Sequence, residues 1–198
     1  MPELHYIIGD TTEPIQRPAV ICHVCNDVGG WGRGFVLSLS AKYPEAEQAY
    51  RAWFENPGKS FKLKTNTAMQ TPWTHELGKC QIVQVKPDIW VANIIGQHGT
   101  QYVGKVPPIR YDALEEGLKS ANIFASGLGK SLSQKEMTLH MPRLGAVLAG
   151  GEWPEIERII KKTMLVESYV YTLPNQAWKW KDKYENPEKS QEGNLVGA

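Results

Sequence analysis

Short apolar segments alternate with helix-like segments along most of the chain. The segments expected to form strands are rich in apolar and β-branched residues: 4–10, 19–24, 79–85, 89–97, 137–142 and 168–174. The segments expected to form helices lie between them: 34–43, 44–54, 108–126 and 152–165. The strands AVICHV and WVANIIG are apolar on both faces, which is typical of strands buried between two layers. The alternation therefore predicts an α/β fold whose sheet is covered on both sides.

The composition is that of a globular protein without strong charge. The chain has 198 residues, of which 41% are hydrophobic, and its formal net charge is +1 at pH 7. This balance gives no general attraction to nucleic acid or membrane, and no apolar run approaches the roughly 20 residues that span a bilayer. Three cysteines and a first segment unlike a signal peptide favour a cytoplasmic protein. We expect a monomer with one domain over residues 1–175, a surface excursion over 56–77 and a polar tail over 176–198.

Four glycines fall within six positions between a predicted strand and a predicted helix: Gly29, Gly30, Gly32 and Gly34. Backbone N–H groups at such a junction attract anions, and glycine lets the backbone approach a ligand closely. The segment is therefore either a cradle for a phosphate or diphosphate, or a tight turn that packs a helix on the sheet. Its spacing matches neither the P-loop nor the G-x-G-x-x-G motif.

A second glycine-rich segment, residues 141–153, also follows a strand and precedes a helix. Ligands of open α/β sheets bind at the carboxyl ends of the strands, so the two loops could hold a diphosphate from both sides. Apolar residues on the loops would then cover the ribose and exclude water: Trp31, Phe35, Val147 and Leu148.

With both loops, the chain resembles a macrodomain, the module that binds ADP-ribose. The resemblance runs over about residues 3–174 and begins at Gly9-Asp10, which ends the first strand. It implies that the Asp10 carboxylate binds the adenine amino group, helped by the backbone amide of Thr11. The family's NAAN segment corresponds to HVCN, with His23 in place of the first Asn and Asn26 as the second, which would face the distal ribose. The second loop reads GAVLAGG instead of the common GCGLAGG.

Within the family, the segments HVCN, GWGRGF, LSAKYPEAEQAY and LGKC are most similar to the ADP-ribose 1″-phosphate phosphatase branch. A related branch that cleaves ADP-ribose from glutamate uses a Lys and an Asp. Those positions fall near Gln97 or His98 and at Ala149, so that lysine mechanism is not expected. The resemblance implies a three-layer α/β/α sandwich with a central mixed sheet, and hydrolysis at C1″ without a metal or cofactor. The alternatives are a hydrolase that removes ADP-ribose from modified protein or nucleic acid, and an ADP-ribose reader without turnover.

Candidate site residues follow from these motifs. The catalytic candidates are His23, Asn26, Asp27 and His98. An imidazole titrates near neutrality, so His23 could act as acid or base, although a buried structural His is the alternative. Asp27 is either a general base or a turn cap, and His98 either reaches the distal ribose or is an exposed loop residue. The residues expected to bind ADP-ribose are Gly9, Asp10, Thr11, Gly29, Gly30, Trp31, Gly32, Arg33, Gly34, Phe35, Gly145, Ala146, Val147, Leu148, Ala149, Gly150 and Leu173.

Other conspicuous residues have structural interpretations. Cys22 and Cys25 form a C-x-x-C, but residues three apart on a strand face opposite sides, so core thiols are expected. His140 lies inside an apolar strand and is expected to be structural. Trp178 and Trp180 lie among lysines and could stack on nucleic acid, but packing of both rings back onto the sheet is the favoured interpretation.

Overall fold

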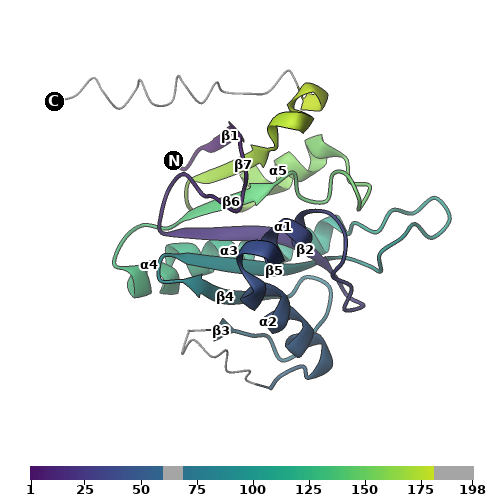
Figure 1. Cartoon of the computed structure of the whole chain (residues 1–198), viewed down its shortest axis with the longest axis horizontal. Helices are drawn as coiled ribbons and strands as arrows, with labels where there is room; N and C mark the ends of the chain where they lie inside the picture. Colours follow the sequence, from purple (N-terminus) through teal and green to yellow (C-terminus); the bar gives the residue numbers. More distant parts are fainter. Residues whose placement is uncertain (60–68, 181–198) are drawn as a thin grey trace.

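The computed structural model describes residues 1–59 and 69–180, which form a sheet with helices on both faces (Figure 1). The strands are β1 (Leu4–Ile8), β2 (Ala19–Asn26), β3 (Met69–Gln70), β4 (Cys80–Lys86), β5 (Ile89–Gln97), β6 (Thr138–Pro142) and β7 (Ser168–Thr172). The helices are α1 (Phe35–Lys42), α2 (Pro44–Glu55), α3 (Tyr111–Ser126), α4 (Leu128–Ser133), α5 (Trp153–Thr163) and the 3-10 helix η1 (Pro174–Trp180). None of these helices has the length and apolar character needed to cross a membrane.

The strands form one mixed sheet in the order β1-β7-β6-β2-β5-β4-β3. The first five strands in this order, β1, β7, β6, β2 and β5, are parallel to one another. β4 is antiparallel to β5, and β3 is antiparallel to β4. The mixed sheet predicted from the family resemblance is therefore confirmed. Its five parallel strands all end at the same edge, which is where the glycine-rich loops begin.

Two hydrophobic cores lie on opposite faces of the sheet, because side chains alternate along each strand. On β2, Val20 and Cys22 pack with α3 and α5, while Ile21 and Cys25 pack with α1 and α2. Figure 1 shows α1 and α2 on the near face and α3 behind the sheet. The three-layer sandwich is confirmed. The cysteines are free and buried, so the prediction of core thiols is confirmed as well.

Most helix starts agree with their sequence signals. Pro44 occupies the first turn of α2, where a missing N–H costs nothing. The helix expected from residue 108 begins only at Tyr111, because residues 108–110 are hydrogen-bonded to other segments, and Arg110 N donates to Gly96 O. Pro108 O accepts a hydrogen bond from His98 N, and Ile109 N donates to Ala149 O. The short helix α4 was not predicted.

Two predicted irregular segments are only partly described. Residues 60–68 of the predicted excursion lie outside the described residues, and the excursion also contains β3, which pairs with β4. The predicted tail begins at residue 176, yet the chain continues through residue 180 as η1, and Trp180 packs against the core. Trp178 is 64% exposed, so the expected packing holds for Trp180 but is wrong for Trp178. Residues 181–198 lie outside the described part of the chain.

Candidate functional site

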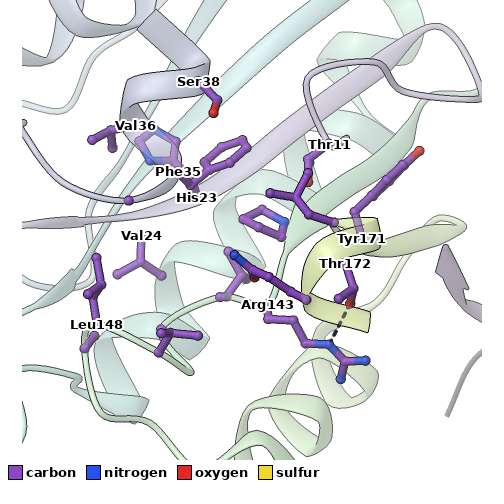
Figure 2. A pocket seen from close by; sticks show the side chains of 18 of the residues that line it. Thr11, His23, Val24, Phe35, Val36, Ser38, Arg143, Leu148, Tyr171 and Thr172 are labelled. Atoms are coloured by element: carbon purple, nitrogen blue, oxygen red, sulfur yellow. Dashed lines mark hydrogen bonds between the residues drawn. The ribbon is translucent and has the colours of Figure 1, made fainter. Parts of the chain in front are cut away.

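A pocket of about 400 Å³ lies at the carboxyl ends of the parallel strands (Figure 2). The sheet order sets the ends of β1, β7, β6, β2 and β5 in one row, so residues after these strands meet there. We call the part formed after β1 and β7 the β1 end, and the part formed after β2 and β5 the β5 end. In Figure 2, Thr11, Tyr171 and Arg143 lie on one side of the pocket, and Val24 and Leu148 lie on the other.

The pocket collects most of the residues predicted to bind ADP-ribose. Those that line it are Gly9, Asp10, Thr11, Arg33, Gly34, Phe35, Gly145, Val147, Leu148, Ala149 and Leu173, together with the catalytic candidate His23. The other predicted site residues do not line it: Asn26, Asp27, Gly29, Gly30, Trp31, Gly32, Ala146, Gly150 and His98. The residues of this second group lie in the loops and strand ends that border the pocket.

Asp10 is held in a fixed direction at the β1 end. Its Oδ1 accepts hydrogen bonds from the Thr12 amide and the Thr12 hydroxyl, both at 2.9 Å. The preceding Gly9 amide donates to Thr172 O on β7 at 2.9 Å, which ties this loop to the sheet. Asp10 is itself exposed, so its carboxylate can accept a hydrogen bond from an amino group of a ligand.

Asn26 shapes the first glycine loop. Its Oδ1 accepts hydrogen bonds from Gly30 N at 2.8 Å and Val28 N at 3.2 Å, and its Nδ2 donates to Gly30 O at 2.7 Å. From α2, the Tyr50 hydroxyl donates to Asn26 O at 2.6 Å. The amide of Asn26 is therefore occupied by the loop instead of facing a ribose as predicted, and its side chain acts as a scaffold.

Trp31 belongs to the core beneath the first loop. It is 9% exposed, and its indole N–H donates to Ser40 Oγ at 2.7 Å. Its ring contacts His23 and Tyr50, with a centroid distance of 5.2 Å in each case. The prediction that Trp31 covers the ribose is wrong, because helices α1 and α2 draw the ring into their core.

The two glycine loops meet over the pocket. Gly34 has φ 76° and ψ −142°, a conformation that is essentially restricted to glycine. A Cβ at this position would lie 2.7 Å from Leu148 Cδ1 on the second loop. Val147 and Leu148 are 61% and 52% exposed, so these apolar side chains are accessible to a ligand, and their predicted role in covering the ribose stays a prediction.

His23 lies at the pocket wall but is almost completely enclosed, with 2% of its surface exposed. Its Nε2 donates to Asn93 Oδ1 at 2.5 Å. The direction of this bond follows from Asn93 Nδ2, which donates to Ala46 O at 3.1 Å and to Gln81 Oε1 at 2.9 Å. Burial lowers the pKa of His23 to about 4, although the bond to Asn93 opposes this shift. A neutral imidazole fixed in a buried network favours the structural interpretation over the catalytic one.

Asp27 and His98 form a pair at the β5 end. Asp27 Oδ2 lies 2.6 Å from His98 Nδ1, and Asp27 Oδ1 accepts a hydrogen bond from Gly99 N at 2.8 Å. Partial burial would raise the pKa of Asp27, but the hydrogen bonds from Gly99 and His98 outweigh it and hold this pKa below its ordinary value. The side chain of His98 is 55% exposed and that of Asp27 is 17% exposed. A carboxylate thus orients an accessible imidazole, an arrangement suited to acid–base chemistry.

Comparison with known proteins identifies the family, although no family model matches the chain. A macrodomain protein from Streptomyces coelicolor of known structure is 36% identical, with a TM-score of 0.65 over 86% of this chain and 99% of that one. The chain belongs to the macrodomain family. The ADP-ribose 1″-phosphate phosphatase of Candida glabrata is 28% identical over 82% of this macrodomain and 93% of that protein.

A longer relative also matches. The chromodomain-helicase-DNA-binding protein 1-like of Mus musculus is 28% identical over 98% of this macrodomain. The chain spans only 20% of the length of that protein.

Several residues of this macrodomain's pocket were not predicted. Arg143 follows β6, is 8% exposed, and donates from Nε to Thr172 Oγ1 at 3.1 Å. Gln176 and Trp180 of η1 also line the pocket. An arginine after an apolar strand, or a tryptophan in a polar tail, carries no spacing signal that would have revealed these roles.

Proposed function

We propose that this macrodomain binds ADP-ribose derivatives and hydrolyses the 1″ linkage of ADP-ribose 1″-phosphate. The order of chemical groups along the strand ends is the observation that carries the proposal. A carboxylate acceptor, Asp10, stands at the β1 end, two glycine loops meet in the middle, and the Asp27–His98 pair stands at the β5 end. The similarity to the Candida glabrata phosphatase supports the same substrate.

The order matches that of the ligand. A nucleobase amino group would donate to Asp10, and the diphosphate would lie between the two loops, where backbone N–H groups bind anions. Phe35, Val147 and Leu148 supply apolar cover that excludes water from this part of the ligand. The distal ribose and its 1″-phosphate would then extend toward Asp27 and His98.

The pair can supply the proton transfers of the reaction. Water adds to the phosphorus, the bond from phosphorus to the 1″ oxygen breaks, and the products are ADP-ribose and inorganic phosphate. With Nδ1 held by Asp27, the other ring nitrogen of His98 is left to exchange a proton with water or the 1″ oxygen. Asp27 is a positioning residue, which holds the imidazole in one orientation.

Replacement of the pair tests the mechanism. Loss of an acid–base group should lower turnover by about 10² to 10⁴, so His98→Gln should lose most hydrolysis of ADP-ribose 1″-phosphate. Asp27→Asn should lower kcat as well, whereas calorimetry should find ADP-ribose affinity within about threefold of the parent for both variants. Asp88→Asn, the same substitution in the turn between β4 and β5, is the matched control and should remain fully active. Full activity of His98→Gln together with inactivity of His23→Ala would return the catalytic role to His23.

A second candidate function is the removal of ADP-ribose from a modified macromolecule. The segment 99–107 projects from the β5 end and closes on itself through paired hydrogen bonds between Val103 and Val106 (Figure 1). Tyr102, Val103 and Val106 are 55%, 69% and 54% exposed, which gives an apolar contact surface beside Asp27 and His98.

A turnover panel separates the candidates. It should contain ADP-ribose 1″-phosphate, glutamyl-ADP-ribosylated protein and ADP-ribosylated DNA. Release of phosphate from the first substrate alone supports the phosphatase. Binding of ADP-ribose with no turnover of any substrate would identify a reader and contradict the proposal.

A further inference from the structure

Arg143 is enclosed by aromatic rings beside the β1 end of the pocket. Its guanidinium carbon lies 4.4 Å from the ring centroid of Trp180, 4.6 Å from that of Trp153 and 5.0 Å from that of Tyr6. The same side chain donates to Thr172 Oγ1 on β7 at 3.1 Å. Cations over aromatic faces gain more where water is excluded, so the cluster fixes the guanidinium against β7.

Trp180 brings a distant part of the chain to this cluster. It ends η1, which immediately follows β7, and its ring meets Trp153 of α5 with a centroid distance of 6.2 Å at 67°. Trp180 also lines the pocket, as do Arg143 and Gln176. In Figure 2, Arg143, Thr172 and Tyr171 lie beside the ribbon of η1. The last turn of the described chain is therefore a wall of the pocket.

We propose that Trp180 is a positioning residue which, through Arg143, sets how firmly a purine base is held against the Asp10 carboxylate. This proposal rests on the proposed binding of ADP-ribose. Asp10, Thr11, Leu173, Gln176 and Trp180 all line the pocket at the β1 end. Without the indole, Arg143 loses one of the rings that cover it and the pocket loses a lining side chain, so a base would be held less firmly beside Asp10.

Base discrimination is the readout that separates this role from a structural one. Calorimetry should compare the binding of ADP-ribose with that of inosine diphosphate ribose. In the inosine compound, a carbonyl oxygen replaces the amino group that would donate a hydrogen bond to Asp10. The parent should prefer ADP-ribose by about tenfold, because a carboxylate cannot accept a hydrogen bond from a carbonyl. Trp180→Ala should weaken the binding of ADP-ribose by about tenfold. It should also reduce the preference for ADP-ribose over inosine diphosphate ribose by at least about threefold.

Two further variants complete the experiment. Trp180→Phe keeps an aromatic face over Arg143 and should restore the preference for ADP-ribose. Trp178→Ala removes the same side chain from the same helix, but Trp178 is 64% exposed and should leave both affinities unchanged.

The outcomes are distinct. Equal loss of affinity for both ligands in Trp180→Ala would show a merely structural role and overturn the inference, as would no loss at all. Failure of the parent to bind ADP-ribose would instead overturn the proposed function, and the inference with it.

Discussion

Acidification should reveal whether His23 is a buried structural side chain. Its ordinary pKa of 6.5 falls to about 4 in the folded protein. Between pH 6.5 and 4, His23 is protonated in the unfolded chain but stays neutral in the folded protein. The free energy of unfolding therefore falls as the pH is lowered toward 4. Each pH unit in this window is worth about 1.4 kcal/mol, so His23 should remove about 2 kcal/mol of stability between pH 6.5 and 5.

The loss from His23 can be separated from that of other groups. Burial also lowers the pKa of His140, to about 3, so His140 should add a loss of about 2 kcal/mol over the same window. The parent should therefore lose about 4 kcal/mol from these two imidazoles, and His23→Asn should lose about 2 kcal/mol less than the parent, because every other group titrates alike in both proteins. The variant also loses the bond to Asn93, which lowers its stability at every pH, so the deciding quantity is the change with pH.

Urea unfolding at pH 7, 6 and 5 measures these differences, and equal m-values in parent and variant keep the comparison valid. If His23→Asn loses as much stability as the parent on acidification, folded His23 titrates near its ordinary value. That result would refute the structural interpretation and favour His23 again as an acid–base catalyst.

Three substitutions test the binding groups. Gly32→Val should leave the melting temperature unchanged, because a Cβ at Gly32 meets no atom within 4 Å. It should weaken the binding of ADP-ribose, because the valine side chain would obstruct the first loop. Unchanged affinity would show that this loop is only a structural turn. Asn26→Asp places a carboxylate oxygen against Gly30 O, so urea unfolding should show a loss of about 1–3 kcal/mol; no loss would contradict the scaffold role. Asp10→Ala should weaken ADP-ribose in calorimetry by about tenfold or more, since charge-assisted hydrogen bonds contribute about 1.5–3 kcal/mol; full affinity would move the base elsewhere.

The architecture could be predicted well because the apolar pattern reports burial directly. β2 and β5 are apolar on both faces and lie at the centre of the sheet, between two helical layers. The sequence contains no comparable signal for α4 or β3. Their six and two residues are too short for a period to emerge, and their formation depends on tertiary contacts.

The pocket lies at the strand ends, where the sequence placed the candidate site, but the direction of individual side chains was not predictable. Trp31 points into the core because Ser40 of α1 accepts a hydrogen bond from its indole N–H, and Tyr50 of α2 packs against its ring. Asp27 and His98 were both candidates, yet they are 71 positions apart and meet only because β2 and β5 are neighbours. Such contacts are set by the order of strands in the sheet, which local spacing does not encode.

The position of β1 has a consequence for how the chain acquires its binding site. Among the strands that the structure describes, β1 lies at the edge of the sheet and pairs only with β7, with Leu4 opposite Ser168. Contacts between segments so far apart close a very long loop and form late, so most of the chain must be synthesised before Asp10 gains its partner strand. During synthesis the glycine loop after β2 can therefore be complete while the β1 end is still open. We expect a nascent chain to acquire its nucleobase contacts last.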